Sequence, residues 1–230
     1  MNDDDELKSI YVNSYTSKSG EKLKLPNGAK APIGLVRNYG SVFYDLFRKS
    51  IHDKKINQRF NLKDKVILDI GCGSGQFCYD AVSLFGAKKS YGIDIASVNL
   101  GITDSFVTDQ ISFFEGDSTK IPLEDDSVDI TTSFLVLEHI PTDNLFKVLS
   151  EMNRVTKEGW ILSIRHAKSS QPPHRLTVQN LTWWKKQISK YVSEIEMIDI
   201  PSDNFKWGRG ENPLYSRTVS VSKKFRRKND

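Results

Sequence analysis

Hydrophobic and polar positions follow two rhythms along this chain. Runs of aliphatic and β-branched residues indicate strands that are buried on both faces, and apolar residues spaced three and four apart indicate helices. The runs predict strands at 65–70, 90–94, 111–115, 127–134 and 160–165, the last after a turn at 157–159. The helical spacing predicts helices at 76–85, 96–108 and 141–155. Because strands alternate with helices, we expect an α/β domain with a parallel sheet covered on both faces.

The segments that flank this alternation have different patterns. Residues 1–32 are polar and contain Gly and Pro, which indicates an extended arm with turns. Apolar residues recur at helical spacing over 36–56, and we expect one or two helices that cap the domain. A further helix is predicted at 178–190, followed by strands at 192–200 and 214–222 that pair as an antiparallel hairpin at the sheet edge. We therefore divide the chain into an N-terminal arm with cap helices, 1–60, and a main domain, 61–225.

Composition narrows the class of protein. The chain has 230 residues, 38% hydrophobic and 27% charged, which fits a globular protein. A net charge of +4 is too small to indicate nucleic-acid binding by itself. Cys72 and Cys78 lie close together without a neighbouring histidine, so we expect neither a disulfide framework nor a metal site. The acidic first residues and the lack of a long apolar run point to a cytoplasmic protein without a membrane span.

The strongest local signal is a glycine-rich segment between a predicted strand and a predicted helix, Asp69-Ile70-Gly71-Cys72-Gly73-Ser74-Gly75. Glycines at such a turn let the backbone reverse sharply and approach a ligand. The dinucleotide fingerprint requires a further glycine where this chain has Gln76. The Gly-Lys-Ser/Thr signature of a phosphate loop is missing as well. The segment therefore predicts a nucleotide-like ligand and argues against the phosphate-binding versions of this turn.

Three carboxylates follow the predicted strands at the edge where open α/β sheets bind ligands. Asp69 ends the first strand, where it would repel a diphosphate and suit an amino group. Asp94 ends the second strand, about 20 residues past the loop, where an acid accepts from a ribose diol in a charge-assisted bond worth roughly 1.5–3 kcal/mol. Asp117 follows the third strand. An amine, a ribose and an adenine amino group would match these three acids.

This constellation resembles the class I S-adenosylmethionine-dependent methyltransferases, in particular their small-molecule branch, often called type 11. Beyond the glycine segment, the resemblance is carried by Gly92-Ile93-Asp94-Ile95, Glu115-Gly116-Asp117-Ser118, Ile121 to Asp129, Leu137-Glu138-His139-Ile140 and Arg154 to Gly159. It implies a Rossmann-like fold with a seven-stranded, mostly parallel sheet, an antiparallel last strand and helices on both faces. It also implies S-adenosyl-L-methionine as the methyl donor and S-adenosyl-L-homocysteine as the product.

The resemblance assigns donor binding to residues at the strand ends, namely Asp69, Gly71, Cys72, Gly73, Asp94, Ile95, Asp117, Ser118, Phe134 and Leu135. Asp69 would hold the amino group of the methionine part, which the loop glycines would contact. Asp94 would take the ribose hydroxyls, and Ile95 would pack on adenine. Asp117, with Ser118 close by, would meet the adenine amino group. The last two residues of the set would border the methyl group.

The acceptor is predicted mainly from what the fourth strand lacks. It ends in Ser133-Phe134-Leu135-Val136 instead of the Asn/Asp-Pro-Pro-Tyr turn of enzymes that methylate adenine or amide nitrogens. Neither cysteine follows a proline, as cytosine-5 enzymes require. We therefore expect the acceptor to be an oxygen or amine of a small molecule, such as a sugar or another metabolite. A hydroxyl acceptor needs a base, a task that suits histidine, and the candidates are His139, His166 and His174.

Alternatives stay open for the function and for His139. Lys185-Lys186 and the basic tail would suit an RNA or protein methyltransferase, although the core has no basic stripe with interleaved aromatics, which argues against nucleic acid. A protein that binds the donor without catalysis would keep the same loop and acids. His139 could equally be structural and bridge its loop to the carboxyl side of the donor. No pattern predicts the oligomeric state.

Overall fold

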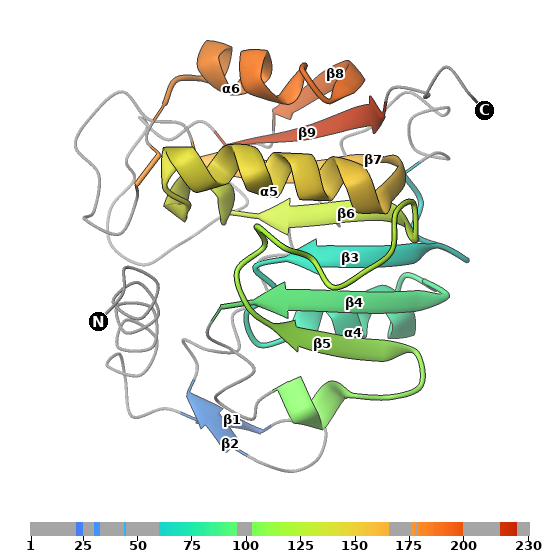
Figure 1. Ribbon diagram of the computed structural model, residues 1–230. Coiled ribbons are helices and arrows are strands. Elements are labelled where there is room, and N and C mark those ends of the chain that lie inside the picture. Colours follow the sequence, from blue (N-terminus) through green and yellow to red (C-terminus); the bar gives the residue numbers. More distant parts are fainter. Residues whose placement is uncertain are drawn as a thin grey trace.

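The computed structural model describes residues 22–24, 30–32, 44, 60–95, 103–165, 176–177, 179–199 and 217–224 (Figure 1). Its described strands are β1 (Lys22–Lys24), β2 (Lys30–Pro32), β3 (Val66–Ile70), β4 (Lys89–Asp94), β5 (Ile111–Glu115), β6 (Val128–Phe134), β7 (Thr156–Arg165), β8 (Val192–Asp199) and β9 (Arg217–Lys224). Its described helices are α4 (Gln76–Ser83), α5 (Thr142–Val155) and α6 (Leu181–Ile188), with short 3-10 helices η3 (Thr103–Phe106) and η4 (Leu137–His139).

One large sheet organises the structure, with the strand order β5-β4-β3-β6-β7-β9-β8. The first five strands in this order, β5, β4, β3, β6 and β7, are parallel to one another. This confirms the predicted Rossmann-like arrangement. β9 runs antiparallel to both β7 and β8. The chain leaves β3 toward β4 on one side and reaches β6 on the other, so the strand order reverses at β3. In open α/β sheets this reversal point is where the carboxyl edge can receive a ligand.

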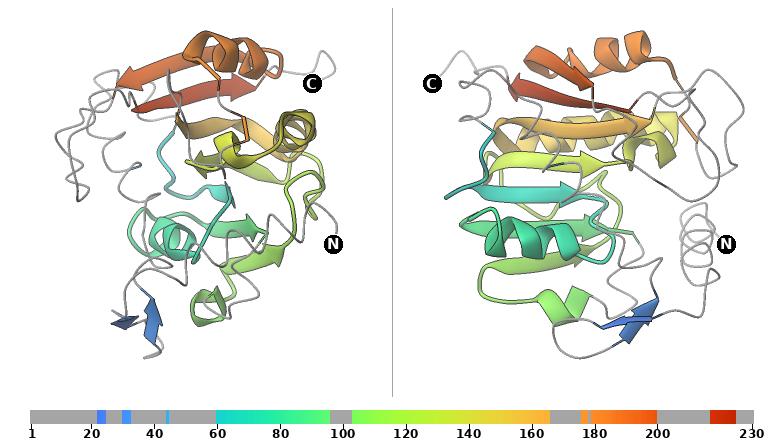
Figure 2. Two further views of the ribbon diagram at one scale, coloured as in Figure 1. Left: turned by 90° about the vertical axis from the view of Figure 1, so that its left-hand side faces the viewer. Right: turned by 180° about the vertical axis from the view of Figure 1, so that it is seen from behind.

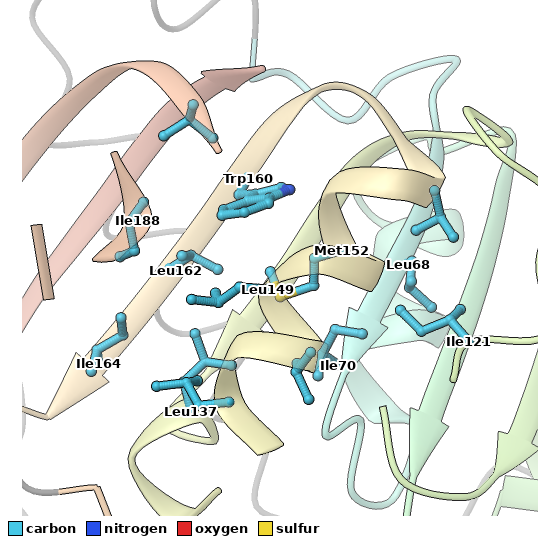
Figure 3. Packing of buried hydrophobic residues seen from close by; sticks show 14 of the residues in the cluster. Leu68, Ile70, Ile121, Leu137, Leu149, Met152, Trp160, Leu162, Ile164 and Ile188 are labelled. Carbon is cyan, nitrogen blue, oxygen red and sulfur yellow. The ribbon is translucent and has the colours of Figure 1, made fainter. Parts of the chain in front are cut away.

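Helices cover both faces of the sheet, with α4 on one face and α5 on the other (Figure 2). Alternate residues of β3 enter the two cores: Ile67 packs on the α4 side with Phe77, and Leu68 packs on the α5 side. Figure 3 shows the α5 side, where Met152 of α5 and Trp160 of β7 belong to one buried cluster. Because burial of each such side chain contributes about 1.5–3 kcal/mol, the two cores fix the sheet that carries the site.

Tyr44, from the N-terminal part of the chain, packs into the core on the α4 side. Its side chain is fully buried. The hydroxyl donates to the carbonyl of Phe60 at 3.1 Å and accepts from the N–H of Leu62 at 3.0 Å. The ring packs edge-on against Phe77 and Phe85. The rest of the predicted cap, 36–56, lies outside the described residues, and in the predicted arm β1 and β2 pair as an antiparallel ribbon.

Two predicted helices have the wrong bounds. The described part of the helix predicted at 96–108 is the 3-10 helix Thr103–Phe106, followed by a bridge between Thr108 and Ile111. Its Thr-Asp-Ser sequence favours turns over a helix interior. The helix predicted at 178–190 begins only at Leu181, because the side chain of Asn180 accepts the N–H of Trp183 at 2.9 Å and caps it.

The turn predicted at 157–159 is also wrong, since β7 already begins at Thr156. Val128 pairs with Thr156 and Ile130 pairs with Gly159, so β7 contains one residue more than β6 over this stretch. Such a β-bulge leaves the extra residue outside the ladder and bends the strand locally. Its Lys157 lies 3.6 Å from the carboxylate of Asp129. The polar residues 157–159 therefore lie in a bulged strand and not in a turn.

Arg154, in the last turn of α5, holds the loop between β5 and β6. Its guanidinium donates to the carbonyls of Ile121 at 2.9 Å and Leu123 at 2.7 Å, and to the carboxylate of Asp125 at 3.0 Å. Glu151, three residues earlier, accepts from Arg154 and from the N–H of Ile121. These bonds, first of all the one from Arg154, lower the pKa of Glu151. The loop is thus fixed by one guanidinium.

We expect Arg154→Lys to lower the free energy of unfolding by about 2 kcal/mol, because an ammonium lacks the fixed fork that reaches several acceptors at once. Urea denaturation followed by circular dichroism measures the change. Lys157→Gln is the matched control: its ion pair with Asp129 is long and half exposed, so the loss should stay below about 0.5 kcal/mol. Equal losses in the two variants would show that Arg154 has no special role.

Candidate functional site

The carboxyl ends of β3, β4, β5 and β6 lie at one edge of the sheet, at the left in Figure 1. The loop after β3 forms the centre of this edge. Its residues Gly71, Gly73 and Gly75 adopt positive φ angles of 69°, 56° and 78°. Residues with a Cβ rarely adopt this left-handed conformation. The glycines therefore allow the sharp turn that takes the chain from β3 into α4.

The three glycines differ in what surrounds them. A Cβ on Gly71 would lie 2.3 Å from a methyl carbon of Val136, and a Cβ on Gly75 would lie 2.5 Å from the ring of Phe113. These two glycines are required by packing inside the protein. A Cβ on Gly73 would meet none of the described atoms within 4 Å. Among the described residues, Gly73 thus has open space beside it, where a ligand can approach the backbone.

Hydrogen bonds to β4 fix the loop in place. The N–H groups of Gly71 and Cys72 donate to the carbonyl of Ile93 at 2.8 Å and 3.1 Å. The N–H of Gly73 donates to Oδ2 of Asp94 at 2.9 Å. The carboxylate of Asp94, half-buried at the end of β4, therefore holds the open glycine. A ligand that contacts Gly73 meets this negative charge beside it.

Asp69 is a buried acid directly before the loop. Only 4% of the residue is exposed, and its Oδ1 accepts from the hydroxyl of Thr132 at 2.7 Å. Burial raises the pKa of Asp69 from 3.8 to about 7; Thr132 opposes the rise, and the charge of Asp94 adds to it. A buried acid with a pKa near neutrality at a sheet edge is a candidate functional group.

The raised pKa of Asp69 predicts how pH affects stability. Between about pH 4 and 7 the folded state keeps a proton that the unfolded state has lost, so the contribution of Asp69 is full below its unfolded pKa and disappears as pH rises through about 7. Asp69→Asn removes this loss. We expect the melting temperature of the variant to rise relative to that of the wild type between about pH 4 and 7, with the smallest difference near pH 4 and the largest at pH 8. Thermal unfolding followed by circular dichroism measures both; a difference independent of pH would contradict the raised pKa.

Cys72 and Gly92 pack beneath the loop. Cys72 is 7% exposed, and its sulfur lies 2.8 Å from the position of a Cβ on Gly92. Burial raises the pKa of the Cys72 thiol, so the group stays protonated. Phe113, which is in register with Gly92 on β5, fills the remaining space. The side chain of Cys72 is therefore a packing group, and only its backbone lies in the loop.

The residues after β4 and β5 lie at the same edge. Asp117 accepts the backbone N–H of Thr119 at 2.9 Å and also its hydroxyl, which closes a tight turn. Ser118 is buried, and Ile95 is half-buried after the end of β4. The structure thus places the predicted adenine-binding residues near one another, and it gives the carboxylate of Asp117 a local structural task as well.

The end of β6 borders the glycine loop. Phe134 is buried and packs edge-on against Phe77 of α4, with ring centres 5.0 Å apart. Leu135 has a φ of 60°, which is rare for a residue with a Cβ and is commonly held at functional sites. Its N–H donates to the carbonyl of Ser163 at 2.8 Å. This turn brings Val136 against Gly71.

The next segment, η4, contains the predicted catalytic histidine. His139 is half-buried, and its backbone N–H donates to the carbonyl of Val136 at 2.8 Å. The neighbouring Glu138 is buried, and its carbonyl accepts the N–H groups of Leu176 and Thr177. Of the three predicted histidines, His139 alone is described, and it follows the strand end that borders the loop. His166 and His174 lie outside the described residues.

A comparison with protein families identifies which kind of nucleotide-binding domain this sheet belongs to. Residues 67–159 match the family model described as a methyltransferase domain. Residues 67–159 therefore form a methyltransferase domain. The matched segment begins in β3 and ends in β7, so it contains the glycine loop, all three strand-end acids and η4. The methyltransferase domain therefore coincides with the parallel part of the sheet.

Individual relatives of this methyltransferase domain act on different acceptors. Norajmaline N-methyltransferase of Rauvolfia serpentina is 31% identical over 178 residues, which are 66% of this chain and 58% of the relative. Protein arginine N-methyltransferase 1 of Chlamydomonas reinhardtii is 35% identical over 86 residues, 34% of this chain and 24% of the relative. The chain spans less than two thirds of the length of the first curated relatives that it matches.

A solved structure agrees with the fold. Phosphoethanolamine N-methyltransferase 2 of Haemonchus contortus, in complex with phosphomonomethylethanolamine and S-adenosylhomocysteine, superposes with a TM-score of 0.61. The alignment covers 80% of this chain and 52% of that chain at 14% identity. Within the residues that the structure describes, every helix is too short or too polar to act as a membrane span. In the same ranges, no three metal-ligating side chains are arranged to hold an ion.

Several residues that shape the site of this methyltransferase domain were missed by the sequence analysis. Thr132 holds Asp69, Phe113 fills the space above two glycines, and Val136 packs against Gly71. None of them follows a motif, because each acts across neighbouring strands. One signal was available for Phe113: a glycine inside a strand is commonly covered by an aromatic residue on the adjacent strand.

Proposed function

We propose that this chain is an S-adenosyl-L-methionine-dependent methyltransferase that moves a methyl group to an oxygen or amine of a small molecule, such as a sugar or another metabolite. One observation carries the donor assignment. Gly73 faces open space beside the carboxylate of Asp94, in a loop that begins at the buried acid Asp69. An aminoacyl nucleoside fits this arrangement, since its amine and ribose can donate to the two acids, whereas a diphosphate would be repelled.

The proposal gives each residue at the edge a role. Asp69 binds the amino group of the donor, and the loop residues Gly71, Cys72 and Gly73 bind its methionine part through their backbone. Asp94 accepts from the ribose hydroxyls. The adenine lies against Ile95, Asp117 and Ser118, and the methyl group is bordered by Phe134 and Leu135. The buried and half-buried positions of these residues along four strand ends support this assignment.

When bound, the donor supplies a methyl group that is already activated by a positively charged sulfur. The residues of the chain then have to orient the acceptor, exclude water and, for a hydroxyl acceptor, remove its proton. His139 is our first candidate for the proton, with His166 and His174 as the others. General-base catalysis of this kind contributes typically about 10²–10⁴-fold. A structural role for His139 is the competing proposal.

The proposal extends to the whole chain. Residues 61–225 form the methyltransferase domain, in which β8 and β9 complete the seven-stranded sheet with a reversed last strand, and residues 1–60 form an arm and a helical cap. The burial of Tyr44 in the domain core supports a cap that packs on the domain. We place the protein in the cytoplasm and its acceptor among small metabolites.

A transfer assay with methyl-labelled donor tests the function. The enzyme is incubated with a panel of small metabolites carrying hydroxyl or amine groups, with bulk RNA, and with a protein mixture. We expect label in a small molecule. Label in protein is the outcome favoured by the short segment that resembles protein arginine N-methyltransferase 1, and it would overturn the acceptor class. Donor binding without transfer to any fraction would overturn the enzymatic function.

The same assay tests the histidine. His139→Ala should bind the donor with wild-type affinity and transfer label at least about 100-fold more slowly if the acceptor is a hydroxyl. Phe146→Ala is a matched control, because Phe146 lies in the adjacent α5 and its ring packs against Trp183 of α6. Full turnover in His139→Ala would remove His139 from the mechanism and leave it a structural residue.

A further inference from the structure

Thr132 lies beside Asp69 in the centre of the sheet. The two residues are in register on the adjacent parallel strands β3 and β6. Thr132 is fully buried, and its hydroxyl donates to Oδ1 of Asp69 at 2.7 Å. The carbonyl of Leu68 is a second acceptor within reach, at 3.3 Å. A hydroxyl has one proton and two lone pairs, so it can form a hydrogen bond with Asp69 whether the carboxyl group is ionised or protonated.

The hydrogen bond between Thr132 and Asp69 can form in two protonation states of Asp69. With Asp69 ionised, the hydroxyl of Thr132 donates to the carboxylate. With Asp69 protonated, the carboxyl group donates to Thr132, whose own proton then turns to the carbonyl of Leu68. Both arrangements leave every buried group with a partner, which is what burial requires. Thr132 can therefore hold Asp69 in one orientation while its charge changes.

The other titratable groups that face Asp69 offer it no positive charge. Asp94 approaches from β4 and repels the ionised form. Cys72 from the loop and Cys78 from α4 also interact with Asp69, and burial raises the pKa of both thiols, so they remain neutral. Thr132 is thus the group among the described residues that stabilises the carboxylate by a hydrogen bond.

We propose that Thr132 is a positioning residue for the donor: it orients the carboxylate of Asp69 so that Oδ2 receives the ammonium group of S-adenosylmethionine. This inference rests on the proposed donor. Binding of an ammonium group requires the ionised form of Asp69, so a donor that binds near neutral pH displaces the proton of Asp69. The proton passes to the solvent, and Thr132 sets the pH at which this exchange takes place.

The test uses the full chain and two substitutions. Thr132→Val keeps the shape and the β-branch that suit a central strand but removes the hydroxyl. Thr132→Ser keeps the hydroxyl. Donor affinity is measured by calorimetry from pH 5.5 to 8 for both variants, the wild type and Asp69→Asn. In parallel, the pKa of Asp69 is followed by NMR of its carboxyl carbon, which needs no donor.

We expect wild-type affinity to rise with pH through about 7, where Asp69 ionises. In Thr132→Val the rise should move up by about one pH unit, which means about fivefold weaker binding at pH 7 and about tenfold weaker binding at pH 6 and below. Thr132→Ser should restore the wild-type profile, and Asp69→Asn should bind weakly without the rise. A general loss of fold would weaken binding at every pH and would not move the midpoint.

Two results would overturn the inference, and they differ. If Thr132→Val binds the donor with the wild-type midpoint and the pKa of Asp69 does not change, Thr132 has no positioning role although the donor site stands. If no form binds the donor while the pKa of Asp69 still responds to Thr132→Val, the proposed donor itself is wrong, and the positioning role falls with it.

Discussion

Asp94→Ala is expected to weaken the binding of S-adenosylmethionine by about a hundredfold, or about 2.7 kcal/mol. The substitution removes the carboxylate proposed to accept from the ribose, in charge-assisted bonds of roughly 1.5–3 kcal/mol. It also releases the N–H of Gly73, which the carboxylate holds at 2.9 Å. Titration calorimetry at pH 8, where Asp69 is ionised, measures the change in affinity.

Two further variants separate the contributions of Asp94. Asp94→Asn keeps an oxygen for Gly73 and loses the charge, so we expect a loss of about tenfold. Asp129→Ala is the matched control at the opposite end of the sheet. Its carboxylate likewise accepts a backbone N–H, that of Val66 at 2.8 Å, so the variant should lose stability and bind the donor normally. Wild-type affinity in Asp94→Ala would remove this residue from the donor site.

The second large effect distinguishes two glycines of the loop. Gly73→Ala should remain folded, because it adds only the strain of a left-handed alanine, roughly 1–2 kcal/mol. Its methyl group would occupy the space that we assign to the donor, so affinity should fall by more than about 50-fold. Gly71→Ala should lose about 4 kcal/mol of stability, because the same strain adds to a contact of 2.3 Å with Val136. Urea denaturation and calorimetry together measure both variants.

A double variant that removes the contact between residue 71 and Val136 provides the control for Gly71→Ala. Adding Val136→Ala to Gly71→Ala removes the methyl carbons that crowd the new Cβ, so part of the lost stability should return while the backbone strain remains. Gly73→Ala has no such partner and should gain nothing from Val136→Ala. The account of the loop fails if Gly73→Ala binds the donor as tightly as the wild type, or if Gly71→Ala is as stable as Gly73→Ala.

The parallel sheet could be predicted because each of its strands has a recognisable local sequence pattern. Val66–Ile70 is apolar except for Asp69 and lies between Lys65 and Gly71, and a strand buried on both faces needs a mostly apolar run. The glycine spacing and the acids at the strand ends likewise follow from short segments. These features predicted the place of the site, since the carboxyl ends of parallel strands necessarily share an edge.

The contacts inside the site could not be predicted in the same way. The bond between Thr132 and Asp69 depends on β6 lying next to β3 and on the register of the pair, and neither is written in a local pattern. The same holds for Phe113, which covers two glycines from β5. The polar residues 157–159 predict a turn from local pattern alone, and only the pairing of β6 with β7 places them at a bulge.

The central claim is that the edge of the sheet binds an aminoacyl nucleoside rather than a phosphate-bearing nucleotide. It is tested most directly by titrating the wild-type chain at pH 8 with S-adenosylmethionine and, in parallel, with a dinucleotide that carries the same adenosine and a diphosphate. We predict binding of one equivalent of S-adenosylmethionine and no measurable binding of the dinucleotide, because Asp69 repels the phosphates and Gln76 replaces the last glycine of the dinucleotide fingerprint. Tighter binding of the dinucleotide, or no heat with S-adenosylmethionine, would contradict the account.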